Sequence, residues 1–405
     1  MKILAAFFLP ISLLPAGDWP NFHGPNQDLI SQEKLPADPD FENVVWRAKV
    51  GIGFSSFAVV DGRAYTIGHT GGEQETVWCF DVKTGKEVWK DTYDAPLIAR
   101  FYEGGPGSTP TFSDSRVFTY SKHGHLHAYD AKTGDLIWKR DMPAEAGLRR
   151  LPEWGFACSP LLVDGGKKLV IEAGATFALD PATGEVLWKS GNFTPGYGTP
   201  MAFEFAGKQL LAMLKTEGLV VADQADGKTI ATSPWITSFD TNSTTPIALA
   251  DGKIFVSTGY DRGCSLFQLD VKAGSLMAIY ESPKMSNHMN NSVLIDGHLY
   301  GFDGTAHRGR PTEFVCLELA TGKEKWRVPP IDGLGCGSVT ATADGTLLIF
   351  TEKGELVTAP SNPEAFTIGV RTQILGGRCW TVPVLADGRI FCRNARGDVV
   401  CISPD

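Results

Sequence analysis

The sequence predicts an all-β fold, an eight-bladed β-propeller of four-stranded antiparallel blades. Three observations support this prediction: a motif recurs at blade length, Asp-Gly pairs separate short apolar runs, and the two ends of the chain carry complementary parts of one repeat. No long helical period of apolar residues interrupts this pattern. Many short strands joined by frequent turns are typical of sandwiches, barrels and propellers.

The recurring motif consists of an acidic residue, which is aspartate in three of the four clearest copies and Glu318 in the other, then a Thr-Gly pair, then a tryptophan. Its clearest copies run from Cys79 to Trp89, Ala128 to Trp138, Ala178 to Trp188 and Cys316 to Trp326. Weaker copies at Asp223 and Asp270 keep the aspartate and a glycine but lack the tryptophan. Successive aspartates lie roughly 43 to 50 residues apart, which is the length of a four-stranded propeller blade.

Each repeat also contains a hairpin signal ahead of the motif. The Asp-Gly pairs are Asp61-Gly62, Asp251-Gly252, Asp296-Gly297, Asp344-Gly345 and Asp387-Gly388. Apolar runs flank them, and an Asp-Gly pair between such runs is a strong sign of a tight hairpin turn. Each unit is therefore expected to supply a hairpin, a third strand that ends at the motif aspartate, and a fourth strand.

The two ends of the chain are expected to complete one blade. The last unit begins near Arg378, has three strands and stops after Ile402, while residues 44–49 resemble a lone fourth strand with Trp46 in the tryptophan position. Pairing them closes the ring and removes open sheet edges. Residues 44–405 then form one propeller domain of eight blades; seven is the alternative, because the unit around residues 354–357 lacks the motif.

The N-terminus reads as a targeting segment. Residues 1–17 hold one lysine, an apolar run and a small-residue exit, as in a cleaved signal peptide. The run is too short to span a membrane, for which about 20 apolar residues are needed. Residues 18–43 form an N-terminal segment ahead of the propeller, with no cysteine for lipid attachment at its start. We expect a periplasmic or secreted protein without a membrane span.

Charge and motifs exclude several functions. The net charge of -9 offers no basic stripe, so we expect no nucleic-acid partner. His123, His125 and His127 alternate and could share a strand face. The repeat register, however, puts His123 at a turn, and zinc, haem and calcium motifs are lacking. We therefore expect no metal site, and we expect a monomer.

The Asp-Thr-Gly-Trp pattern resembles the tryptophan-docking repeat of propellers of the pyrroloquinoline-quinone (PQQ) type, over nearly the whole mature chain. The resemblance implies that Trp residues pack between neighbouring blades. The implied docking residues are Trp46, Trp89, Trp138, Trp188 and Trp326. Cys79, Cys316 and Cys401 occupy small-residue positions of the repeat. Cys336 and Cys379 stand at matching positions of adjacent blades, and whether they form a disulfide is left open.

Propeller ligands usually meet the loops at one mouth of the central channel. The loops that precede each innermost strand are longest at residues 93–107 and 142–157. They and the later loops bring aromatic, guanidinium and amide groups to this mouth, a combination suited to ligand binding. The candidate ligand or partner residues are Arg100, Tyr102, Glu103, Arg149, Arg150, Trp154, His288, Asn290, Asn291, Arg378 and Trp380.

Two functions are consistent with this pattern. The first is an exported, non-catalytic binding or scaffold propeller for a protein partner or a small polar ligand, similar to the propeller lipoprotein of the outer-membrane β-barrel assembly machinery. It requires no catalytic residue and no cofactor. The alternative is a quinoprotein alcohol or sugar dehydrogenase with PQQ and calcium. That class has an adjacent cysteine pair and an acidic calcium set, and neither is evident in this sequence.

Overall fold

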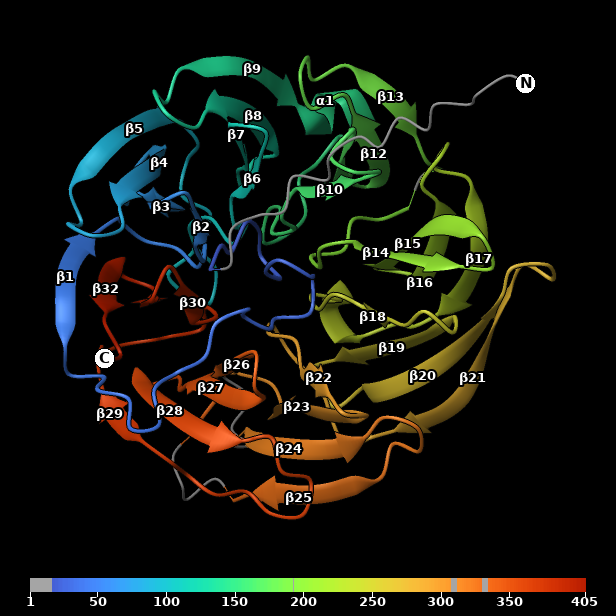
Figure 1. Ribbon diagram of the computed structural model, residues 1–405. Helices are drawn as coiled ribbons and strands as arrows, with labels where there is room; N and C mark the ends of the chain where they lie inside the picture. The colour runs from blue at the N-terminus through green and yellow to red at the C-terminus, as the bar shows by residue number, and fades with distance from the viewer. Residues whose placement is uncertain (1–16, 192, 307–311, 330–333) are drawn as a thin grey trace, which may run out of the picture.

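The computed structural model describes residues 17–191, 193–306, 312–329 and 334–405. The described residues form eight four-stranded antiparallel sheets arranged as blades around a central axis (Figure 1). The prediction of an eight-bladed propeller is confirmed. Within these residues, helical structure is limited to α1 (Met142–Ala146) and the 3-10 turn η1 (Ser238–Asp240).

The strands follow one another from the innermost to the outermost position of each blade. The first blade contains β2 (Ala58–Val60), β3 (Arg63–His69), β4 (Gln74–Asp81) and β5 (Glu87–Asp94), and the second contains β6 (Thr111–Ser113), β7 (Arg116–Tyr120), β8 (His125–Asp130) and β9 (Leu136–Asp141). The third contains β10 (Leu161–Val163), β11 (Lys168–Ala173), β12 (Ala175–Leu179) and β13 (Val186–Lys189). The fourth contains β14 (Met201–Phe205), β15 (Lys208–Lys215), β16 (Gly218–Asp223) and β17 (Thr229–Pro234). The fifth blade contains β18 (Ile247–Ala248), β19 (Lys253–Thr258), β20 (Gly263–Asp270) and β21 (Ser275–Ser282). The sixth contains β22 (Val293–Ile295), β23 (His298–Asp303), β24 (Glu313–Glu318) and β25 (Glu324–Val328). The seventh contains β26 (Ser338–Ala341), β27 (Thr346–Phe350), β28 (Glu355–Pro360) and β29 (Arg371–Gln373).

The eighth blade combines both ends of the chain. It consists of β30 (Val384–Ala386), β31 (Arg389–Arg393) and β32 (Asp398–Ile402), with β1 (Val44–Lys49) as its outermost strand. β1 pairs antiparallel with β32, and Trp46 lies opposite Cys401. The seven-blade alternative was wrong, because β26 to β29 form a sheet without the motif. Strand pairing depends on apolar alternation, which this unit retains, and not on the docking residue.

The repeated motif forms both a turn and a contact between blades. In the first blade, Asp81 Oδ1 accepts hydrogen bonds from the amide and the hydroxyl of Thr84, at 2.9 and 2.7 Å, which fixes the turn between β4 and β5. In the five blades that carry the motif tryptophan, its Nε1 donates to a carbonyl of the next blade. These pairs are Trp46 with Val82, Trp89 with Ala131, Trp138 with Pro181, Trp188 with Gln224 and Trp326 with Asn362.

Tyr280 performs the docking role in the fifth blade, where the motif tryptophan is missing. Its hydroxyl donates to the Leu319 carbonyl of the sixth blade at 2.9 Å. A side-chain Cβ at Gly322 would lie 2.5 Å from the Tyr280 ring, so the ring occupies the space that this glycine leaves. The sequence pattern did not identify Tyr280, because only tryptophan was sought at that position.

A buried arginine joins the eighth blade to the first. The guanidinium of Arg393 is fully buried and donates to the carbonyls of Gly51, Ser55 and Ile67 at 2.7 to 3.0 Å, and to the Thr66 hydroxyl at 3.1 Å. Across the described residues, no carboxylate forms an ion pair with it. Arg393 therefore links the closing blade to the first blade through backbone acceptors rather than through a salt bridge.

The eight cysteines, all within the described ranges, are free and buried. Cys336 and Cys379 do not form a disulfide. Burial, the largest cause, raises the pKa of both thiols to about 12. Since the thiolate is the reactive form, these cysteines behave as small packing residues.

The native protein is expected to resist thiol reagents. Titration with Ellman's reagent should label essentially no cysteine in the folded protein and all eight after unfolding in guanidinium chloride, because burial both shields the thiols and disfavours the thiolate. Fast labelling of one or more thiols in the folded protein, or fewer than eight after unfolding, would contradict this assignment.

The N-terminal segment crosses one end of the central channel. Trp19 forms a β-bridge to Val59 of the first blade, and Ile30 forms one to Ala341 of the seventh blade. Phe22, between them, lies against a small cavity in the channel. The segment therefore spans the channel between the first and the seventh blade.

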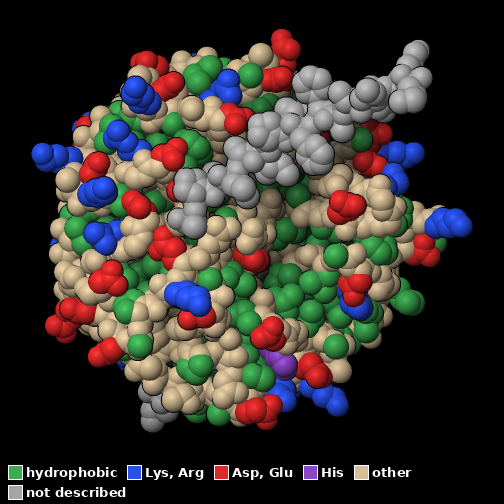
Figure 2. All heavy atoms as spheres, in the orientation of Figure 1, with side chains coloured by type: hydrophobic (Ala, Val, Ile, Leu, Met, Phe, Trp, Pro, Cys, Tyr) green, Lys and Arg blue, Asp and Glu red, His purple; other side chains and the backbone are tan. Residues whose placement is uncertain are grey.

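Charged side chains of both signs are interspersed over the face shown in Figure 2. This face offers no continuous basic surface of the kind that nucleic-acid binding needs. Among the described helical segments, none has the length and apolar character required to cross a membrane.

Candidate functional site: an aromatic cavity at the channel mouth

A cavity of about 560 Å³ lies at the mouth of the channel. Most of its described lining residues are aromatic, and the full set is Phe101, Tyr102, Lys122, Trp154, Ala157, Tyr197, Phe239, Thr241, Ser243, Tyr260, His288, Met289 and Trp380. A deeper cavity of about 140 Å³ shares several of these residues and extends to Phe22 and Phe54. The size of the outer cavity falls within the range of small-molecule sites.

The lining side chains come from connections that converge on the axis. Most are the links from the outermost strand of one blade to the innermost strand of the next, such as β5 to β6 and β17 to β18. The others are turns between second and third strands: Lys122 follows β7, and Tyr260 follows β19. Loops held on a rigid ring of strands can differ in sequence without disturbing the blades.

Ring contacts organise the wall into three groups, one of which is the pair of Trp154 and Tyr197 at 5.9 Å. The rings of Phe239 and Tyr260 lie 5.3 Å apart, and those of Tyr260 and His288 lie 5.1 Å apart. In the third group, Phe54 stacks on Trp380 at 5.3 Å and contacts Tyr102 at 5.6 Å. Such pairs stabilise each other beyond their burial, so the wall presents fixed apolar surfaces to the cavity.

Lys122 is the cationic member of the described lining and is only 3% exposed. Its Nζ donates to the Tyr102 hydroxyl at 2.6 Å and to the Trp154 carbonyl at 2.7 Å. Nζ also lies 5.2 Å from the centre of the Tyr102 ring, within the distance of a cation–π contact. Two loops thus hold the lysine in place at the cavity wall.

Burial lowers the pKa of Lys122 to about 8, while the nearby Glu75 carboxylate opposes this shift. Glu75 lies behind the lysine, where its carboxylate accepts hydrogen bonds from the Lys122 amide at 3.3 Å and from the Tyr93 hydroxyl at 2.9 Å. Burial raises the pKa of Glu75 to about 7. With a pKa of about 8 the lysine is mostly protonated at neutral pH, and among the residues that the structure describes no carboxylate forms a hydrogen bond with its Nζ.

Four of the predicted ligand residues line the outer cavity: Tyr102, Trp154, His288 and Trp380. Asn290 lines the deeper cavity, and its Nδ2 donates to the carbonyls of Gly337 and Trp380. Asn291 instead joins two blades, because its side chain exchanges hydrogen bonds with the Thr245 backbone.

The predicted charged residues lie outside the described lining. Arg100 forms an ion pair with Glu153 at 2.6 Å, and Arg149 and Arg150 are exposed. Glu103 binds Arg378 at 2.5 Å, and the Arg378 guanidinium lies 4.5 Å from the Trp380 ring. The two ion pairs hold these side chains near the rim, where long charged side chains can stay hydrated. A part of these residues in binding stays a prediction.

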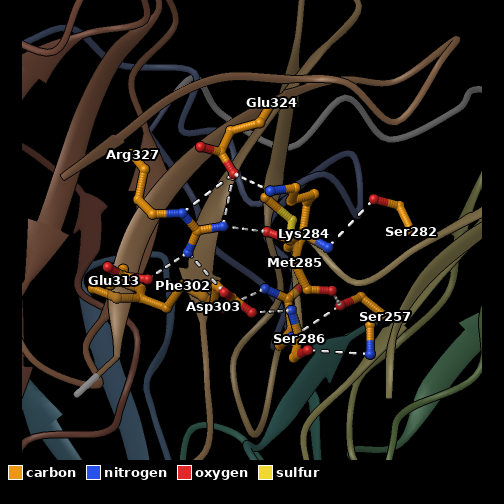
Figure 3. Close-up of polar contacts among 12 residues, drawn as sticks. Ser257, Ser282, Lys284, Met285, Ser286, Phe302, Asp303, Glu313, Glu324 and Arg327 are labelled. Atoms are coloured by element: carbon orange, nitrogen blue, oxygen red, sulfur yellow. Dashed lines mark hydrogen bonds and ion pairs between the residues drawn. The ribbon is translucent and has the colours of Figure 1, made fainter. Parts of the chain in front are cut away.

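A polar network supports the loop that carries His288 and Asn290 (Figure 3). Arg327 bonds Asp303 at 2.7 Å, Glu313 at 2.6 Å and Glu324 at 2.9 Å. Asp303 in turn accepts the Ser286 amide at 2.8 Å. The network anchors the start of the loop to the sixth blade. The carboxylates of Asp303, Glu313 and Glu324 therefore stabilise the structure of this loop.

The sequence did not identify Lys122, Tyr197, Tyr260 or Met289 as members of the site. Lys122 and Tyr260 lie in short turns between second and third strands, which were not considered part of the mouth. The signal that could have found them is the repeat register, since the turn after every second strand faces the same end of the propeller as the long loops.

The described residues contain no cluster of three or more His, Cys, Asp or Glu side chains that could hold a metal ion. His123 instead contacts the Pro96 carbonyl, and the ring of His127 is buried against Tyr93. The described cavity lining also lacks a carboxylate. Calcium prefers carboxylate and carbonyl oxygens, so these residues do not fit a calcium-bound quinone.

Comparisons with known proteins place the chain among propellers of this type. A family profile described as "Outer membrane protein assembly factor BamB" matches residues 37–153 and 73–328. Polyvinylalcohol dehydrogenase of Sphingopyxis sp. (strain 113P3) is 29% identical over 170 residues, covering 38% of this chain and 24% of that protein. The match thus spans about a quarter of this curated relative.

Solved structures share the fold at low sequence identity. BamB from Moraxella catarrhalis superposes with a TM-score of 0.61 and 15% identity, covering 88% of this chain and 98% of that one. A europium-containing methanol dehydrogenase has a TM-score of 0.64 and 12% identity, with 95% and 89% covered. Because the family profile extends over more than half of its residues, the chain belongs to the PQQ-like propeller family described as outer membrane protein assembly factor BamB.

Proposed function

We propose that this protein is an exported, non-catalytic binding propeller whose aromatic mouth cavity receives its ligand or an inserted group of a protein partner. The observation that carries the proposal is the composition of the cavity wall. Seven Phe, Tyr and Trp side chains surround one buried ammonium group, and the described lining has no carboxylate to serve as a base or a calcium ligand. Such a wall favours binding over proton abstraction.

The family is compatible with this role, since its printed description is that of an assembly factor. The dehydrogenases among the relatives make oxidation of an alcohol or sugar the alternative. Their chemistry requires a group that accepts a proton from the substrate and a site for the quinone and its metal. The absence of a carboxylate from the described lining argues against a site for the metal, and His288 is the residue of this lining that could accept a proton. We place the protein in the periplasm or outside the cell, in keeping with the signal-like residues 1–17.

The proposal is tested by asking whether the cavity binds small neutral aromatic molecules. Saturation-transfer NMR with indole and p-cresol is expected to show binding to the unaltered protein. Ser243→Trp should abolish it, because Ser243 lines both cavities and an indole there fills them. The matched control is Ser238→Trp, at an exposed position outside the described lining, which should bind as the unaltered protein does. Equal binding by both variants would contradict the cavity as the site.

A further inference from the structure

We propose that the cavity is selective for a small aromatic molecule that bears a single carboxylate, with the carboxylate at Lys122 and the ring between the aromatic walls. This inference rests on the proposed function and specifies its ligand class. Three properties of the wall support it: its charge, its shape and the hydrogen bonds of its polar groups.

The charge of the wall calls for one anion. Lys122 is only 3% exposed. Across the described ranges, no carboxylate lies within ion-pair distance of its Nζ. An ammonium has three N–H donors, and two are used by Tyr102 and Trp154. One donor is left at a position that lines both cavities. Glu75 lies behind the lysine and partly compensates its charge. The third N–H donor of Nζ still lacks an acceptor among the described residues, so an anionic group in the cavity would gain a charge-assisted hydrogen bond there.

The shape of the wall calls for a flat apolar body. Trp380 and Tyr102 form one ring pair of the lining, and Tyr260 and Phe239 form another. Aromatic rings bind other aromatic rings in offset or edge-to-face arrangements. A volume of about 560 Å³ accommodates a two-ring molecule with room for its substituent.

The polar groups of the wall argue against a polyhydroxylated ligand such as a sugar. The Thr241 hydroxyl donates to the Ser238 carbonyl at 3.0 Å, and the Ser243 hydroxyl donates to the Thr241 carbonyl at 3.4 Å. The Tyr102 hydroxyl accepts from Lys122. A sugar would bury several hydroxyls with few partners left to pair them, at a cost for each. One carboxylate on an aromatic body matches the one available cation.

Three naphthalene probes of equal shape test the inference on the unaltered protein. Calorimetric titration at pH 6.5 compares 2-naphthoate, the neutral 2-naphthamide and the cationic 2-naphthylmethylammonium. We expect one site for 2-naphthoate with at least tenfold higher affinity than for the amide, and the weakest binding for the cation. Equal or tighter binding of the amide or the cation, or no binding of 2-naphthoate, overturns the ligand class.

Variants then assign the charge to Lys122. Lys122→Met keeps the length of the side chain and is expected to lower 2-naphthoate affinity about tenfold, to the level of the amide, while amide affinity stays within about twofold. Lys139→Met, at an exposed position on β9, is the matched control and should change neither. An unchanged preference for 2-naphthoate in Lys122→Met overturns the assignment. Tight amide binding that Ser243→Trp abolishes would refute the ligand class alone, leaving the proposed function intact.

Discussion

Replacing Trp89 with alanine is expected to lower the free energy of unfolding by about 4 kcal/mol, the range for removing a large aromatic side chain from a core. Trp89 is 7% exposed and packs between the rings of Tyr65 and Tyr129, at 5.9 Å from each. Its Nε1 donates to the Ala131 carbonyl of the next blade at 2.9 Å. Urea unfolding followed by circular dichroism measures the loss.

Two control variants separate the parts of this contact. Trp89→Phe keeps a ring but removes the donor, and it should cost clearly less than the alanine variant. Val88→Ala changes the adjacent, partly exposed residue on the same strand and should alter stability by less than about 0.5 kcal/mol. A loss below about 1 kcal/mol for Trp89→Ala would show that the docking tryptophan does not hold the blades together.

Replacing Arg393 with methionine is expected to lower the free energy of unfolding by about 3 kcal/mol. The substitution keeps most of the side-chain volume but removes the hydrogen bonds that Arg393 donates to Gly51, Ser55, Thr66 and Ile67. The Ser55 carbonyl still accepts from the Thr66 hydroxyl at 3.2 Å. An unpaired buried polar group costs about 1 to 3 kcal/mol, and removal of a desolvated charge offsets part of the sum. Urea unfolding again gives the measurement.

Arg396→Met is the matched control, because Arg396 is exposed and lies in the same β31–β32 connection. It should leave stability nearly unchanged. If Arg393→Met proves as stable as the unaltered protein, the cost of burying the charge equals the benefit of its hydrogen bonds. Closure of the ring would then depend mainly on the pairing of β1 with β32.

Much of the fold could be predicted because the blades repeat the same short turn sequences at regular spacing. The Asp-Gly turns and the Asp-Thr-Gly turns are encoded in a few adjacent residues, and the complementary ends predicted the pairing of β1 with β32. The docking role of Tyr280 was not predicted. A tyrosine hydroxyl can replace the indole N–H only where the fold brings it within hydrogen-bonding distance of the next blade, and this placement cannot be read from the motif.

The candidate site was predictable in position but only partly in composition. The loops before the innermost strands predicted Tyr102, Trp154, His288 and Trp380 as site residues, and all four line the cavity. The charged residues of the same loops turn to partners, as Arg100 does to Glu153. Lys122 has no distinguishing sequence context, and its importance follows from burial beside Tyr102 and Trp154, which no pattern of neighbouring residues reveals.

Titration of PQQ into the purified protein with and without calcium, followed by an assay of the mixture for dye-linked oxidation of alcohols and sugars, tests the proposed binding function most directly. We expect no substrate-dependent dye reduction, and any PQQ affinity should be independent of calcium, because the described cavity lining offers no carboxylate ligand. Calcium-dependent binding that Ser243→Trp abolishes, together with turnover, would contradict a non-catalytic binding propeller and make the mouth cavity an oxidoreductase site.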